Sequence, residues 1–188
     1  MKIVGISGSI VGSKTKTAMS QTIQTLQERY PDADVTLIDL AEYEIQFSDG
    51  RNYLDYPGDT KYVTETMMEA DALIIGTPIF QASIPGTLKN LFDLLPVDAF
   101  RDKVVSMVVT AGSAKHYLIA EQQLKPILGY MKAQVLQNYV FIEEQDFYRK
   151  EIVNDDVFFR IERLVEETMV LAETYQHMRQ AEDEKYGF

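Results

Sequence analysis

Residues 72–96 read ALIIGTPIFQASIPGTLKNLFDLLP, an apolar run followed by a loop rich in Pro, Ser and Thr and then by a Leu-rich stretch. The almost purely apolar run 72–76 predicts a strand that is buried on both faces. The range 85–95 predicts a helix with a proline near its start, where the missing N–H costs nothing. A buried strand, a loop and a helix in this order form the repeating unit of a parallel α/β sheet.

The same unit recurs on both sides of this segment. Further strands are predicted at 2–7, 35–40, 104–110 and 135–142, and further helices at 15–30, 61–69, 117–131 and 155–179. Residues 41–59 predict a long loop, and Pro126 predicts a kink or a break in its helix. Five strands that alternate with helices predict one doubly wound parallel domain over residues 1–180, with helices on both faces of the sheet. The acidic tail 181–188 is expected to fray.

Composition excludes several classes of function. The 188 residues carry a net charge of −11, which argues against nucleic acid as a partner because the phosphate backbone needs a basic face. Absence of cysteine excludes disulfides and a thiol nucleophile, and the presence of only two histidines argues against a metal site. No signal peptide and no membrane-spanning run is recognised, so a cytoplasmic location without membrane contact is expected.

Ligands of such sheets bind beyond the carboxyl ends of the strands, which points to the loops 7–17, 77–86 and 110–116. The first loop, SGSIVGSKTKT, precedes a helix and offers hydroxyls, free N–H groups and two lysines to a phosphate. The simpler alternative is that Ser13 or Thr15 only caps the helix. The loop matches neither GxxxxGK[ST] nor GxGxxG, which disfavours a nucleoside triphosphatase or a classical dinucleotide enzyme.

The other two loops suit a flat ring. In the second, two prolines flank Ile79 and Phe80, giving a rigid apolar wall with free amide groups for a heteroaromatic ligand. The alternative places Phe80 in the core. In the third loop, Gly112 permits close approach of a ligand to the backbone. His116 either touches a ligand or begins a helix with a hydrogen bond to the backbone.

Several segments together resemble the NADPH-dependent FMN reductase family. They are Gly-Ile-Ser-Gly-Ser at 5–9, the whole of 76–96, and 111–116 followed by Gln-Leu-Lys-Pro-Ile-Leu at 123–128. The last run is similar to the sulfonate-utilisation flavin reductases of that family. Two positions depart from the family pattern: Val11 stands where Arg is frequent, and Phe80 where Tyr is frequent. The missing cation is therefore assigned to Lys14 or Lys16.

The resemblance implies a flavodoxin-like fold with strand order 2-1-3-4-5 and an FMN site at the three loops. The phosphate is expected at Ser9, Ser13, Thr15, Lys16 and Thr17. The isoalloxazine is expected against Pro78, Ile79, Phe80 and Gln81, with Ser83 nearby, and its other edge at Thr110, Gly112 and Ser113.

The implied activity is that of an NAD(P)H-dependent FMN reductase, in which hydride passes from nicotinamide to FMN without a catalytic side chain. The resemblance favours delivery of reduced flavin to a partner monooxygenase and assembly into a homodimer or homotetramer. Two alternatives stay open. One is an oxidoreductase that keeps its FMN bound and reduces a quinone or an azo dye, and the other is an electron carrier like a flavodoxin.

Overall fold

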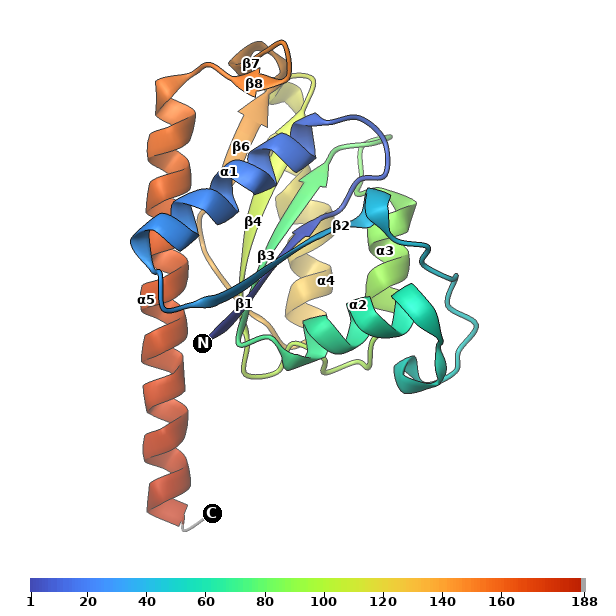
Figure 1. Cartoon of the computed structure of the whole chain (residues 1–188), viewed down its shortest axis with the longest axis vertical. Coiled ribbons are helices and arrows are strands. Elements are labelled where there is room, and N and C mark those ends of the chain that lie inside the picture. The colour runs from blue at the N-terminus through green and yellow to red at the C-terminus, as the bar shows by residue number, and fades with distance from the viewer. Residues whose placement is uncertain (187–188) are drawn as a thin grey trace.

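The computed structural model describes residues 1–186. One parallel sheet has the strand order β2-β1-β3-β4-β5, with β6 also paired to β4 (Figure 1). This confirms the predicted order 2-1-3-4-5. The strands are β1 (Lys2–Ser7), β2 (Asp34–Asp39), β3 (Ala72–Pro78), β4 (Val104–Ala111), β5 (Gln134–Val135) and β6 (Val140–Glu143).

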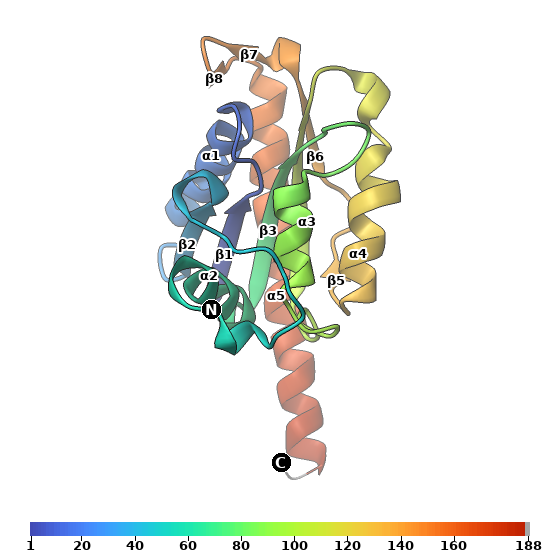
Figure 2. The ribbon, with the colours of Figure 1, turned by 90° about the vertical axis from the view of Figure 1, so that its right-hand side faces the viewer.

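Helices cover both faces of the sheet, as predicted (Figure 2). Helices α1 (Lys14–Arg29) and α5 (Asp155–Tyr186) lie on one face, and α2 (Gly58–Glu69), α3 (Gly86–Asp93) and α4 (Lys125–Tyr130) lie on the other. Alternate residues of a strand serve the two layers because successive side chains point to opposite faces. In β3, Leu73 and Ile75 pack with the α2–α4 layer, whereas Ala72 and Ile74 pack with α1 and α5.

The predicted strand 135–142 is wrong as a continuous element. It is divided into β5 and β6, which pair with the same edge of β4. Val104 pairs with Gln134 and Val108 with Val140, so four residues of β4 face six residues of its neighbour. Two extra residues must therefore bulge out of the edge, which is where sheets tolerate an interrupted ladder.

The predicted helix 117–131 is broken, as Pro126 indicated. A π-helical segment, Ala120–Leu124, ends directly before α4, and Pro126 stands in the first turn of α4. A proline is accepted there because the first turn needs no N–H donor, whereas it removes a bond from the interior of a helix. The long loop predicted at 41–59 ends two residues early, because α2 begins at Gly58. Before α2 the loop is irregular, apart from 3₁₀ turns at Leu40–Glu42 and Tyr53–Asp55.

The last helix is longer than predicted. Helix α5 does not stop at Arg179 but continues to Tyr186, and its end projects past the sheet (Figure 1). Residues 180–186 contain no proline or glycine and consist mostly of good helix formers, namely Gln, Ala, Glu and Lys, so no local signal stops the helix. The predicted fraying of 181–188 stays a prediction, and its last two residues lie outside the described chain.

Within residues 1–186, no helix combines the length and the apolar character that crossing a bilayer requires. The cytoplasmic location stays a prediction.

Candidate functional site

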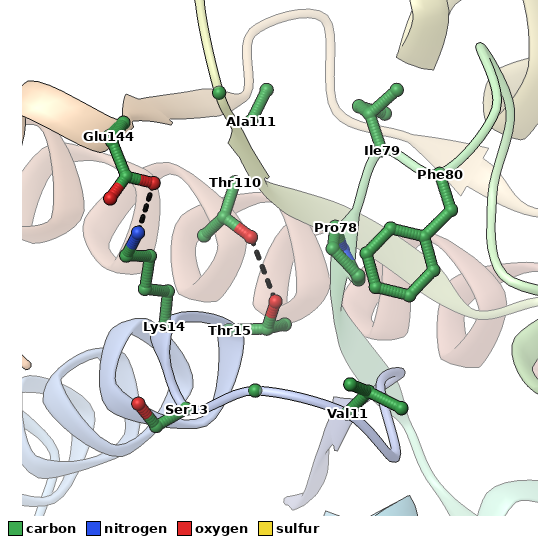
Figure 3. Close-up of a pocket in the computed structure, with 12 residues that line it drawn as sticks. Val11, Ser13, Lys14, Thr15, Pro78, Ile79, Phe80, Thr110, Ala111 and Glu144 are labelled. Atoms are coloured by element: carbon green, nitrogen blue, oxygen red, sulfur yellow. Dashed lines mark hydrogen bonds and ion pairs between the residues drawn. The ribbon is translucent and has the colours of Figure 1, made fainter.

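The three post-strand loops meet at one end of the sheet, as expected, and enclose a cavity of about 360 Å³ (Figure 3). Seven of the predicted site residues line it. They are Ser13, Thr15, Pro78, Ile79, Phe80, Thr110 and Gly112. Its other lining residues are Val11, Gly12, Lys14, Ala111 and Glu144.

The start of α1 opens onto this cavity and carries no acidic residue of its own. Ser13 is the N-cap residue, but its side chain makes no capping hydrogen bond, and the first turn contains no acidic residue. Thr15 does not cap the helix either, because its hydroxyl lies 2.8 Å from that of Thr110. The capping alternative is therefore wrong, and the positive end of the helix dipole faces the cavity.

Glycine is required in the first loop for two different reasons. Gly12 has φ +80°, a backbone conformation that side chains disfavour, and a Cβ there would meet no atom within 4 Å. Gly8 is needed for close approach, since a Cβ would lie 2.7 Å from the carbonyl oxygen of Gly76. The loop can thus turn tightly and leave open space in front of α1.

Three predicted phosphate residues lie outside the lining of the cavity. The Ser9 hydroxyl donates to the carbonyl of Val11 at 2.7 Å, and that of Thr17 donates to the carbonyl of Lys150 at 3.1 Å. Lys16 Nζ lies 2.9 Å from Asp39 Oδ2 and 2.6 Å from Glu42 Oε1.

The two lysines of the first turn therefore have different environments. The hydrogen bonds that Lys16 donates to Glu42 and, second, to Asp39 raise the pKa of Lys16 above its usual value, so this cation is satisfied on another side of α1. Lys14 is the lysine that reaches the cavity. Residues two apart on a helix point in different directions, which is why only one of them can do so.

The second loop forms the apolar wall that its prolines indicated. Phe80 is 42% exposed and lines the cavity beside Pro78, so the alternative of a core phenylalanine is wrong (Figure 3). The amides of the wall are not free, however. The Ile79 N–H donates to the Thr110 carbonyl at 3.0 Å, and Phe80 and Ser83 exchange two backbone hydrogen bonds of 2.9 Å.

A strained turn lies at the tip of this loop. Gln81 and Ala82 have φ of 49° and 57°, the left-handed region that costs a non-glycine residue about 1–2 kcal/mol. Positive φ at both central residues is the geometry of a tight hairpin turn. Ser83 donates its hydroxyl to the Gln123 side chain at 3.1 Å, which joins the turn to the π-helical segment. Gln81 and Ser83 do not line the cavity.

The third loop brings Thr110, Ala111 and Gly112 to the cavity. Gly112 lines the cavity, whereas Ser113 does not. The N–H of His116 donates to the Ser113 carbonyl at 3.2 Å in a 3₁₀ turn, and His116 does not line the cavity, which matches the simpler interpretation of this residue.

Sequence analysis missed Glu144. It stands directly after β6 and forms an ion pair with Lys14 at the edge of the cavity (Figure 3). The rule that predicted the other three loops applies to it too, because β6 also ends at this edge of the sheet.

Comparison with known proteins agrees with this site. The family model described as NADPH-dependent FMN reductase matches residues 1–147. The chain belongs to this family. The predicted resemblance is confirmed, and the chain is an oxidoreductase of a family that uses FMN and NAD(P)H.

Individual relatives are similar over most of their length. The NAD(P)H-dependent FAD/FMN reductase of Geobacillus thermodenitrificans is 42% identical over 90% of this chain and 92% of its own. The NADH-dependent FMN reductase SfnF of Pseudomonas putida is 28% identical over 88% and 90%. The apo structure of the NADH:FMN oxidoreductase EmoB superposes with a TM-score of 0.75 at 25% identity, over 90% of this chain and 88% of that one.

The cavity of this FMN reductase fits a flavin mononucleotide by its chemistry. The start of α1, which has no acidic residue, suits the phosphate group. The apolar wall of Pro78, Ile79 and Phe80 suits the flat ring. A Cβ at Gly112 would also meet no atom within 4 Å, so open space lies before the third loop. Among the described residues, no group of three His, Cys, Asp or Glu could hold a metal ion.

Proposed function

We propose that the chain binds FMN in the cavity between the three loops and reduces it with NAD(P)H. The observation that carries this proposal is that the uncapped, acid-free start of α1 and the apolar wall of the second loop open into the same cavity. Ser13 and the backbone N–H groups of the first turn of α1 would bind the phosphate, with Lys14 beside them. Pro78, Ile79 and Phe80 would pack against the ring.

Binding and orientation are what these residues contribute. When bound, FMN supplies the hydride chemistry, taking a hydride from the nicotinamide. Backbone N–H groups of the second and third loops are candidates to stabilise negative charge on the ring. No side chain of the cavity has to move a proton, and no catalytic residue is assigned.

The direct test is FMN binding followed by turnover. The purified protein should quench the fluorescence of added FMN and then oxidise NADPH in proportion to enzyme. A protein that neither quenches FMN fluorescence nor accelerates NADPH oxidation would contradict the proposal.

We further propose that reduced flavin leaves the cavity and serves a partner monooxygenase. Val11, at the cavity, is 66% exposed, and Phe80 is 42% exposed, so the ring would remain accessible from solvent. Sequential kinetics with a dependence on free FMN would support release. Ping-pong kinetics with tightly held FMN would instead support the alternative, an oxidoreductase for quinones or azo dyes, and slow reaction with NADPH would support an electron carrier.

Phe80→Ala should weaken flavin binding about 3- to 10-fold, because an aromatic contact contributes about 0.5–1.5 kcal/mol beyond its buried area. Phe80 would contact the ring and not the phosphate, so the dissociation constants of FMN and riboflavin should rise equally in fluorescence titrations. Phe80→Tyr keeps the ring and serves as the control. An unchanged affinity of Phe80→Ala for both flavins would remove Phe80 from the binding wall.

A homodimer or homotetramer is also proposed. A second cavity of about 420 Å³ lies between α3 and α4, and its lining includes Val97 and Tyr130, which are 58% and 68% exposed. Large apolar surfaces of this kind are typical of interfaces between subunits. Light scattering of the purified protein would give the mass, and a monomer at micromolar concentration would contradict the proposal.

A further inference from the structure

Lys14 contacts the segment of the chain that follows β6. Its Nζ forms an ion pair with the Glu144 carboxylate and lies 5.8 Å from the centroid of the Phe147 ring. Both partners follow β6, and Glu144 is 130 residues away from Lys14 in the sequence. The cation that lines the phosphate end of the cavity is therefore already paired with an anion of the chain.

Resting on the proposed function, we infer that Glu144 is an internal substitute for the FMN phosphate. Its carboxylate forms an ion pair with Lys14 when the flavin is absent, and this ion pair must break when FMN binds. Glu144 then lowers the affinity for FMN. It does so because the ion pair is lost on binding and because the carboxylate and the phosphate repel each other across one cavity.

The position of Glu144 is fixed by its neighbours. Glu143 and Asp146 form a reciprocal capping arrangement around the short turn that contains Glu144, with the Glu143 N–H donating to Asp146 Oδ2 at 2.8 Å. Asn154 holds the other oxygen of Asp146 at 2.7 Å. Asp146 is 7% exposed, so this support is buried while Glu144 itself stays accessible. The carboxylate is thus held at the edge of the cavity by the fold.

The ion pairs of Lys16 differ from that of Lys14 in their position relative to the cavity. The carboxylates of Asp39 and Glu42 also satisfy a lysine of the first turn, but none of these three residues lines the cavity. Pairing at Lys16 therefore cannot compete with a ligand in the cavity. Among the described residues that line the cavity, Glu144 is the only acidic one, so the Lys14–Glu144 pair places an anion of the chain where the phosphate of the flavin would lie.

The consequence concerns the fate of the flavin. A carboxylate that replaces the phosphate on Lys14 favours departure of FMN, because the cation is paired before binding and after release. This is the behaviour expected of a flavin that is a substrate and leaves, rather than of one that stays bound. Riboflavin has no phosphate and would not displace Glu144 from Lys14. The affinity for riboflavin should therefore not depend on Glu144.

The test is a comparison of flavin affinities by fluorescence titration. Glu144→Gln should lower the dissociation constant of FMN about 3- to 10-fold and leave that of riboflavin unchanged. Glu42→Gln is the matched control, since it removes the same charge from a lysine of the same helical turn at nearly the same exposure, 61% against 63%, but outside the cavity. It should leave the FMN affinity within about twofold.

Lys14→Gln tests whether Glu144 acts on FMN binding through Lys14. Without Lys14, the gain from Glu144→Gln should shrink, since no cation remains to be released. An unchanged FMN affinity in Glu144→Gln, a gain shared by riboflavin or by Glu42→Gln, or a gain that is undiminished without Lys14 would each overturn the inference. If the parent protein binds no FMN, the proposed function fails with it, whereas normal FMN binding with an unresponsive Glu144→Gln overturns the role of Glu144 alone.

Discussion

Ser13→Asp is expected to weaken FMN binding on the order of 100-fold while the protein remains as stable as its parent. Ser13 is the N-cap of α1, lines the cavity and makes no capping hydrogen bond. An aspartate at this position would cap the helix and place a negative charge where the phosphate should bind. Two like charges about 4 Å apart repel each other by about 1 kcal/mol in water and about 4 kcal/mol near a protein surface, which brackets a loss of this size.

The stability and the FMN affinity of Ser13→Asp should respond differently. Asp is as good an N-cap as Ser and suits the positive end of the helix, so the free energy of unfolding in urea should stay equal or rise by up to about 1 kcal/mol. FMN affinity should collapse in fluorescence titrations, whereas riboflavin affinity should hold. A large loss of binding without a loss of stability would place the phosphate at the start of α1.

Ser13→Asn is the matched control, because it has the same shape as aspartate without the charge. It should keep most of the FMN affinity. Equal losses in the two variants would show that shape rather than charge matters at this position. Loss of riboflavin as well as FMN would show damage to the whole cavity, and normal FMN binding by Ser13→Asp would remove the phosphate from this helix.

Gly76→Ala is expected to lower the free energy of unfolding by about 1–3 kcal/mol, the usual cost of overpacking a core. Gly76 lies in β3 under α1, and a Cβ there would stand 2.3 Å from Met19 Cγ and 2.5 Å from its sulfur. It would also stand 3.1 Å from the carbonyl oxygen of Ile6, which is backbone and cannot turn away. Met19 is fully buried, so its flexible side chain has little room to move.

Gly129→Ala provides a control of opposite sign. Gly129 lies in α4, and a Cβ there would meet no atom within 4 Å. Alanine is the better helix former by about 0.8–1 kcal/mol, so this variant should be at least as stable as its parent. Urea unfolding of both variants gives the comparison, and a Gly76→Ala protein with the stability of its parent would mean that α1 shifts freely on the sheet.

Much of the fold could be predicted because the local pattern of apolar residues indicates which strands and helix faces are buried. The run 2–7 predicted β1 to the residue, since a strand covered on both faces has to be apolar. The division of the last strand into β5 and β6 could not be predicted, because the bulge depends on the register against β4 and not on the residues within it. The extension of α5 was missed because an exposed helix end has little apolar periodicity to reveal it.

The sequence by itself determined the family, through the resemblance of its motifs, and with the family the strand order. The three loops that meet at the cavity follow from the rule for carboxyl ends of strands. Only the tertiary structure decided which side chains enter the cavity. Lys14 and Lys16 are equivalent in the sequence, but one meets Glu144 and the other meets Asp39 and Glu42. The direction of a side chain depends on partners far away in the chain, and a local pattern carries no information about them.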